Sequence, residues 1–169
     1  MAHNPRIGLL SEVRALWRLP GIVAERCVHS RMHTASCRRC EDVCPKDAWV
    51  IDDEQLGINI EACDGCGLCA AACPEQAIVS EALPAVRIWN DAAVAFAACE
   101  FAADQKSEAG GMPCLHAIGM PDLVRLYRYG VGRLMVAQGD CGACARHTGP
   151  SLRSSVADLN RFLASRELP

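Results

Sequence analysis

Apolar and polar residues alternate along this chain in short blocks, and the blocks predict mostly short elements. Residues 48–51 and 57–60 are apolar runs on either side of an acidic turn, which predicts two short strands in a hairpin. Further along, apolar residues at helical spacing predict a helix that opens at Pro121 and ends at Gly130. A second helix is predicted at the C-terminus, where one face carries Leu152, Val156, Leu159 and Leu163.

The remaining apolar runs predict further elements. Ser11 can cap a helix that Pro20 stops, so an N-terminal helix is expected. Residues 86–89 and 93–98 are each bounded by polar residues, and they fit two buried strands or a strand and a short helix. Residues 131–136 are rich in aliphatic side chains and predict another strand.

These elements divide the chain into three parts and place it in the α+β class. Residues 1–26 are predicted to form an N-terminal helical arm, residues 27–83 a cysteine-rich domain, and residues 84–169 a small α/β domain that ends in the C-terminal helix. The strand, helix, strand order of the last part is typical of thioredoxin-like or Rossmann-like sheets. We therefore expect ligands of that part to lie at the ends of its strands.

Charge and cysteine content narrow the range of functions. The net charge of −3 over 169 residues argues against nucleic acid as the main partner. Residues 41–110 carry fourteen acidic and three basic residues, and such an acidic face would steer a basic protein partner. Neither an export signal nor a membrane span is recognisable, so a cytoplasmic protein is expected. In a reducing compartment, twelve cysteines indicate metal or redox ligands rather than disulfides.

The cysteine-rich part contains an internal repeat. A shift of 29 residues superimposes three cysteines of one copy on three of the other, and it also places Pro45 on Pro74. The superimposed pairs are Cys37 with Cys66, Cys40 with Cys69, and Cys44 with Cys73. This pattern indicates a duplicated half-site, in which each copy completes the other.

The second copy has the full spacing C-x2-C-x2-C-x3-C-P from Cys63 to Pro74, which is typical of bacterial iron–sulfur proteins. On this motif, residues 27–80 resemble the two-cluster bacterial-type ferredoxin domain. The resemblance implies that one [4Fe–4S] cluster is bound by Cys44, Cys63, Cys66 and Cys69. It implies another cluster whose ligands include Cys37, Cys40 and Cys73.

The fourth ligand of the cluster on Cys37, Cys40 and Cys73 departs from the ferredoxin pattern, because Thr34 stands 29 residues before Cys63. Cys27 is the favoured replacement, since the nine residues between it and Cys37 would span roughly 30 Å when extended. Three alternatives stay open: a nitrogen ligand from His29 or His33, a three-iron cluster, or no cluster at all.

Four cysteines remain in the second half, at Cys99, Cys114, Cys141 and Cys144. Each follows a predicted strand or lies near the end of one, so a parallel sheet would bring all four to one edge and form a complete metal site.

Part of this half is similar to the delta subunit of methyl-viologen-reducing hydrogenase, an electron carrier to heterodisulfide reductase. The similarity rests on Met112-Pro113-Cys114, on Gly139-Asp140-Cys141 and on the short spacing from Cys141 to Cys144. It implies a [2Fe–2S] cluster.

Two other interpretations compete for these four cysteines. Zinc also accepts four thiolates, and a C-x-x-C pair between a strand and a helix is the thioredoxin arrangement. His116 and His147 show no ligand spacing and are interpreted as ordinary side chains.

The predicted function is therefore that of an electron-transfer protein or subunit, and not of an enzyme in its own right. It would relay single electrons between protein redox partners, such as a flavoprotein, a hydrogenase, a molybdenum enzyme or a heterodisulfide-reductase-like subunit. One alternative is a thiol–disulfide or cluster-assembly protein that uses Cys141 and Cys144. Another is an adaptor with a structural zinc site.

Overall fold

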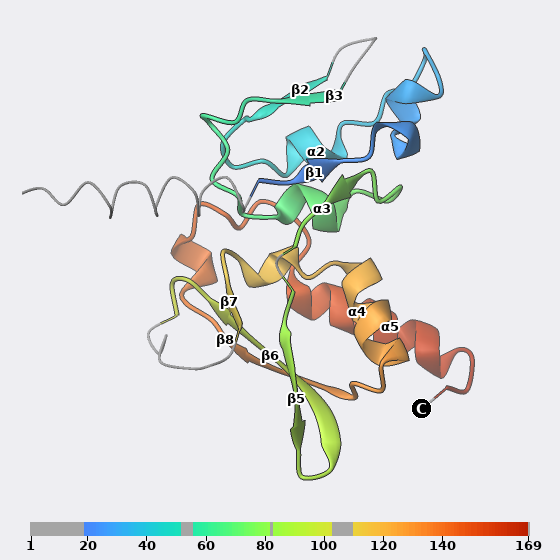
Figure 1. Cartoon of the computed structure of the whole chain (residues 1–169), viewed down its shortest axis with the longest axis vertical. Coiled ribbons are helices and arrows are strands. Elements are labelled where there is room, and N and C mark those ends of the chain that lie inside the picture. Colours follow the sequence, from blue (N-terminus) through green and yellow to red (C-terminus); the bar gives the residue numbers. More distant parts are fainter. Residues whose placement is uncertain (1–18, 52–55, 82, 103–109, 169) are drawn as a thin grey trace, which may run out of the picture.

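The computed structural model describes residues 19–51, 56–81, 83–102 and 110–168. The helix expected after Ser11 lies outside the described residues. Figure 1 shows two halves stacked along the longest axis: a half of short elements, drawn blue to green, and a half built on one sheet, drawn green to red. Among the described helices, none is long and apolar enough to cross a membrane.

The first half consists of short strands and single helical turns. Its elements are β1 (Gly21–Ile22), η1 (Ala24–Arg26), η2 (Val28–Ser30), α2 (Arg39–Asp42), β2 (Trp49–Ile51), β3 (Leu56–Ile58), α3 (Leu68–Ala72) and β4 (Ile78–Val79). The repeat is visible in the backbone, because α3 and β4 follow α2 and β2 at the same 29-residue offset as the cysteines. Asp47 and Gln76, also 29 residues apart, both adopt a left-handed conformation with φ of 47° and 51°.

Two antiparallel pairs complete this half. β2 pairs with β3, with Trp49 opposite Ile58, so the predicted hairpin is confirmed. β1 pairs with β4, and this pairing joins Gly21 and Ile22, which the sequence assigned to the N-terminal arm, to the cysteine-rich part. The apolar core is small: Trp49 and Ile78 are buried together with the cysteines Cys40 and Cys69.

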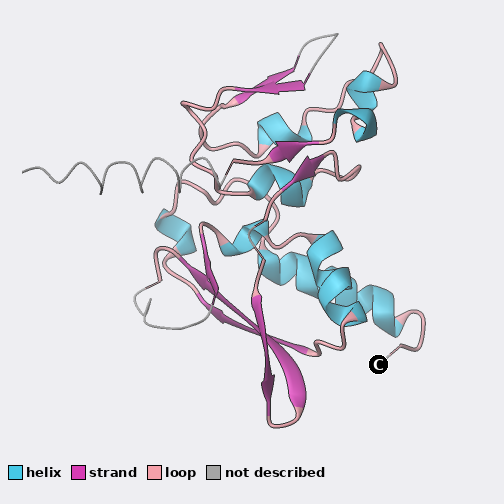
Figure 2. Ribbon diagram, in the orientation of Figure 1, coloured by secondary structure: helices cyan, strands magenta, loops and turns pink. Residues whose placement is uncertain are grey.

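The second half contains the larger sheet and the longer helices (Figure 2). Its elements are β5 (Ala85–Trp89), β6 (Ala92–Cys99), β7 (Gly110–Met112), η3 (Leu115–Ala117), α4 (Met120–Arg128), β8 (Arg133–Ala137), η4 (Cys141–Ala143) and α5 (Leu152–Ala164). β6 is the central strand. β5 and β7 pair with successive stretches of the same edge of β6, and β8 pairs with the opposite edge. Figure 2 shows α4 and α5 packed beside one another.

The sequence predicted a parallel sheet for this half. That prediction holds for β6, β7 and β8, but it is wrong for β5, which runs antiparallel to β6. Only two residues, Asn90 and Asp91, connect β5 to β6, and both have positive φ. A connection this short makes a hairpin, because parallel neighbours need a long crossover.

The main apolar core of this half lies between the sheet and the two helices. Met112 of β7 and Ile118 are almost fully buried there, against Leu123 of α4 and Leu159 of α5. Gly119 is the N-cap of α4, and its peptide N–H donates to the Asp122 carboxylate at 3.3 Å. α5 is capped by the Ser151 hydroxyl, which accepts from the N–H of Ser154. The C-terminal helix predicted from its apolar face is thus confirmed.

The two halves share a packed boundary. Val43, Cys66 and Leu68 of the first half are buried in one cluster with Cys114 of the second. α3 approaches the start of α4 so closely that a Cβ at Gly119 would lie 2.8 Å from the Ala71 Cα. Only glycine fits at that position without moving backbone.

Candidate metal centres

Cys27, Cys37, Cys40 and Cys73 line a single cavity of about 20 Å³ in the first half. Burial is the main cause that raises the pKa of the Cys40 thiol to about 11, and its neighbours Cys37 and Cys73 also raise it. All four of these cysteines are free thiols. The structure therefore brings together the four thiols that the sequence grouped, although Cys27 stands outside the repeat.

The position of Cys27 bears on the open question of the fourth ligand. Its thiol is buried at the junction of η1 and η2, and it faces the cavity. His29 also lines the cavity, but its Nε2 is within 2.7 Å of the Cys37 carbonyl oxygen and so is already hydrogen-bonded. His33 and Thr34 are exposed and are not among the lining residues. Of the candidates, Cys27 is thus the best placed.

A second group is formed by Cys44, Cys63, Cys66 and Cys69. Burial raises the pKa of Cys69 to about 12, and the three other thiols are near enough to raise it as well. Two of the sulfur atoms accept peptide N–H groups: Ala48 N lies 3.3 Å from Cys44 Sγ, and Gly65 N lies 3.4 Å from Cys63 Sγ. Cys44 comes from the first copy of the repeat and the other three from the second, so the copies exchange a ligand position.

The third group contains the four cysteines of the second half. Cys99, Cys114, Cys141 and Cys144 line one cavity of about 20 Å³, together with His116 and His147. Cys99 ends β6 and Cys114 follows β7. Cys141 begins the single turn η4, and Cys144 directly follows it. Burial raises the pKa of Cys114, and nearby Cys99 and Cys144 also raise it. The parallel strands β6 and β7 do deliver thiols to one end of the sheet.

The chemistry of these donor sets fits iron–sulfur clusters. Each group offers four sulfur donors and buries at least one of them, while peptide N–H groups point at several of the sulfur atoms. Buried thiols with raised pKa values become thiolates only when a metal replaces the proton. Within the described residues, no three His, Cys, Asp or Glu side chains are arranged to hold a single ion.

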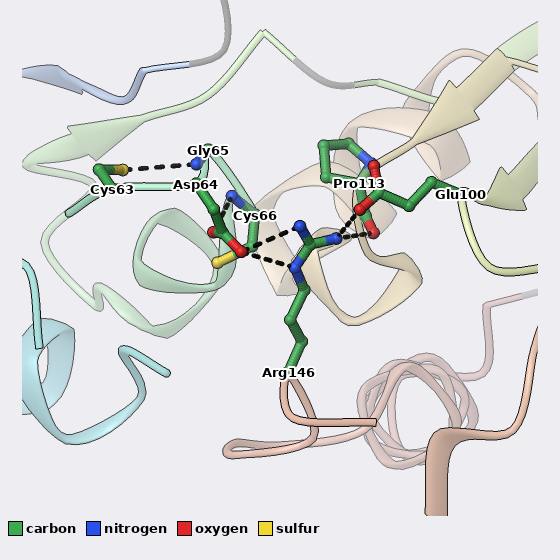
Figure 3. A network of polar contacts seen from close by, with 7 residues as sticks. All are labelled: Cys63, Asp64, Gly65, Cys66, Glu100, Pro113 and Arg146. Carbon is green, nitrogen blue, oxygen red and sulfur yellow. Dashed lines mark hydrogen bonds and ion pairs between the residues drawn. The ribbon is translucent and has the colours of Figure 1, made fainter. Parts of the chain in front are cut away.

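Arg146 connects the second and third groups (Figure 3). Its guanidinium donates to the Asp64 carboxylate at 2.9 Å, and it also pairs with Glu100. The same side chain donates to the Pro113 carbonyl oxygen at 2.8 Å. Asp64 lies in the loop between Cys63 and Cys66, whereas Glu100 and Pro113 adjoin Cys99 and Cys114. One largely buried cation therefore joins the loops of two cysteine groups.

The arginine also acts electrostatically on both groups. Burial raises the pKa of Cys66 to about 12 and raises that of Cys114, while the Arg146 charge lowers both values. Sequence reasoning missed Arg146. The only available signal was its position two residues after Cys144, and that spacing by itself does not distinguish it from an exposed arginine.

Two histidines that the sequence treated as ordinary line the third cavity, and their rings lie 5.3 Å apart. His116 Nδ1 accepts the peptide N–H of Leu152 at 3.0 Å, so the ring proton is on Nε2. That Nε2 is buried and has no hydrogen-bond partner among the described residues. Burial lowers the pKa of His116, and His147 lowers it further, which favours the neutral form of the ring.

A family model matches part of the first half of the chain. Residues 35–78 match the family model of the 4Fe-4S dicluster domain. This segment is thus similar to ferredoxin-type dicluster domains. It contains seven cysteines of the first two groups; Cys27 precedes it, and the four cysteines of the third group follow it. The resemblance of the second half to the hydrogenase delta subunit stays a prediction.

Several curated proteins are similar to parts of this chain. The ferredoxin-type protein NapF of Escherichia coli K12 is 36% identical over 74 residues, which are 41% of this chain and 44% of NapF. The pyruvate synthase subunit PorD of Thermotoga maritima is 37% identical over 65 residues, 37% of this chain and 59% of PorD. One of the chains of polysulfide reductase from Wolinella succinogenes is 43% identical over 51 residues, 27% of each sequence.

The chain thus spans less than half the length of the NapF protein that it matches. No solved structure matches the chain.

Proposed function

We propose that this protein is an electron-transfer component that relays single electrons between protein redox partners. In this proposal two [4Fe–4S] clusters are held by the first and second cysteine groups, and a third centre, a [2Fe–2S] cluster, by the third group. When bound, such clusters supply reversible one-electron oxidation and reduction. Similarity to a ferredoxin-type protein, to a chain of a polysulfide reductase and to a subunit of a pyruvate synthase supports this class of function.

The observation that carries the proposal is the continuous packing of the three groups. Cys40 of the first group and Cys69 of the second are buried in one apolar cluster, with Cys44 and Cys73 packed against it. Cys66 of the second group shares another cluster with Cys114 of the third. The three groups are therefore arranged in a row: side chains of the first pack against the second, and side chains of the second pack against the third.

The chain's own residues would hold and tune these centres. The peptide N–H groups of Ala48, Gly65 and Phe101 donate to Cys44, Cys63 and Cys99, and such bonds stabilise the reduced, more negative state of a cluster. Arg146 supplies positive charge to the second and third sites at once.

The geometry favours this role over the thiol–disulfide alternative. Cys141 begins only the single turn η4, whereas the nucleophile of a thioredoxin-like site precedes a full helix. Burial, together with Cys99, Cys144 and Asp140, raises the pKa of Cys141, although a reactive thiol needs a lowered pKa. Cys99 and Cys114 at the same cavity would also have no part in that chemistry.

The first test is the composition of the protein purified without oxygen. We expect about ten iron atoms per chain with matching sulfide and no zinc, and electron paramagnetic resonance signals of three reduced centres. One zinc and about eight iron atoms would support the adaptor with a ferredoxin domain instead. A chain without iron would refute the electron-transfer proposal.

The second test concerns the relay. Cys141→Ala should still accept electrons from dithionite into its two [4Fe–4S] clusters, yet it should fail to pass them between the native donor and acceptor. Full turnover by that variant would show that the third site is not on the path.

A further inference from the structure

A groove of about 860 Å³ opens beside the first cysteine group, between the end of α3 and the outer face of α4. From the first half it is lined by Arg39, Cys73 and Pro74, and from α4 by Met120, Arg125 and Arg128. Tyr129, which is 74% exposed, stands at the edge. The groove thus spans both halves and is far larger than the two cysteine cavities.

Cys73 gives this groove its significance. The same residue lines the cavity of the first cysteine group, and so do Arg39 and Pro74. A body seated in the groove would therefore be separated from a cluster in that cavity by one ligand residue. This site is at the end of the row of three groups that lies farthest from the third cavity.

The charge of the groove has one sign. Among the residues that the structure describes, three arginines line the groove and no aspartate or glutamate does. Within the described part of the chain, Arg39 and Arg128 form no ion pair, and Arg125 reaches Asp122 only at 3.5 Å. The acidic residues of the ferredoxin half led us to expect a basic partner, but the surface next to Cys73 has the opposite charge.

We propose that this groove is the docking site for an acidic segment of a protein redox partner, and that electrons enter or leave the chain there. The inference rests on the proposed electron-transfer function. With a cluster held by Cys27, Cys37, Cys40 and Cys73, docking would allow one electron to be exchanged with a one-electron centre of the partner, so that one centre is oxidised as the other is reduced.

The composition of the groove and the chain supports that occupant. Arginines and an exposed tyrosine are the residues that carry most binding energy in protein interfaces, and Met120 and Val124 add apolar surface between them. The chain's own residues 1–18 are a poor occupant by charge, because they contain Arg6, Arg14 and Arg18 against a single acid, Glu12.

The test uses a matched pair of double variants in the full-length, cluster-containing protein. Arg125→Glu with Arg128→Glu reverses the charge of the groove on α4. Arg153→Glu with Arg161→Glu makes the same change of net charge on α5, away from the groove. The match extends to contacts, since Arg125 and Arg161 each pair with an aspartate three residues earlier in their helix. Neither pair includes a cysteine proposed as a ligand.

Two readouts are taken at low ionic strength: binding of a fluorescent octaglutamate peptide, and the rate of electron exchange with an acidic flavodoxin. We expect the groove variant to lose peptide binding and to exchange electrons about tenfold more slowly, while the α5 variant stays within about twofold of the parent. Salt should slow the parent and have little effect on the groove variant.

Equal losses in both variants would refute the docking site, since only net charge would then matter. Tighter binding of pyrophosphate than of octaglutamate, abolished by the groove variant, would replace the protein partner with a nucleotide. A parent dimer that the groove variant dissociates would make a second copy the occupant. If the proposed electron-transfer function is wrong, dithionite will not reduce the parent protein. Peptide binding can still be measured in that case, so the docking site is tested separately.

Discussion

The two halves of this molecule assemble their cysteine sites in different ways. In the first half, seven of the eight cysteines proposed as ligands lie in two copies of one short motif, and two of the four described residues buried in its main core cluster are cysteines, Cys40 and Cys69. In the second half, Cys99, Cys114 and the Cys141–Cys144 pair come from separate segments that a sheet collects. Among the described residues of this half, its core contains ten buried residues, of which Cys99 is the one cysteine.

This difference indicates which interactions stabilise each half. A half whose core consists partly of metal ligands depends on the metal for its fold, because protonated thiols bury little apolar area of their own. A half with Leu123, Leu159 and Met112 packed between sheet and helices has a hydrophobic core that does not need the metal. The first half should therefore unfold with its clusters, and the second should survive the loss of its centre.

The largest expected effect tests directly whether the first half depends on metal for its fold. Cys69→Ala should remove the second cluster and unfold the first half, because this thiol is 7% exposed and lies at the centre of the small core. Cys141→Ala is the control, and it should lose only the third centre, since Cys141 is outside the large core. Iron content and thermal unfolding followed by circular dichroism measure both. If Cys69→Ala kept its iron and its melting temperature, the dependence on metal would be disproved.

A smaller effect is expected when the ligand outside the repeat is changed. Cys27→Ser should convert the first cluster to a three-iron form, or lose it, and leave the second cluster unchanged, because the other three thiols of that cavity stay in place. Electron paramagnetic resonance distinguishes the forms. His29→Ala is the matched control at the same cavity, and it should keep the four-iron signal. An unaltered spectrum for Cys27→Ser would indicate a histidine as the fourth ligand or a native three-iron cluster.

The boundary between the halves provides the next prediction. Arg146→Gln removes the cation between Asp64 and Glu100 and should reduce the free energy of unfolding by about 2 kcal/mol, as expected for partly buried charged hydrogen bonds. It should also lower the reduction potentials of the second and third centres together, because positive charge favours their reduced states.

Arg161→Gln is the control for that change, because its pair with Asp158 is exposed and should contribute little. Potentials measured by redox titration would contradict the shared role of Arg146 if only one centre shifted.

The smallest effect concerns His116. Replacing it with leucine removes the Nε2–H donor beside the third cavity and should lower the reduction potential of that centre alone. His116→Gln keeps an N–H donor and should restore part of the potential. If leucine and glutamine behaved alike, the ring would serve packing and not the electrostatics of the centre.

The sequence by itself determined the local part of this protein. The 29-residue repeat, the C-x2-C-x2-C-x3-C-P spacing and the hairpin of β2 and β3 could all be predicted, because each depends on residues close in the chain. The same holds for the grouping of Cys99, Cys114, Cys141 and Cys144, which strand ends predicted. The identity of the clusters in these sites stays a proposal.

Tertiary structure alone decided how distant segments meet. Arg146 reaches Asp64 across 82 residues, and no pattern in the sequence links them. The peptide N–H of Leu152 in α5 donates to Nδ1 of His116 and so keeps the ring proton on Nε2. The basic groove exists because Arg39 and Cys73 of one half face Arg128 of the other, whereas the net charge of the segment had pointed to a basic partner. Spacing along the chain determines which residues share a loop, but the packing of the halves determines which charges face one another.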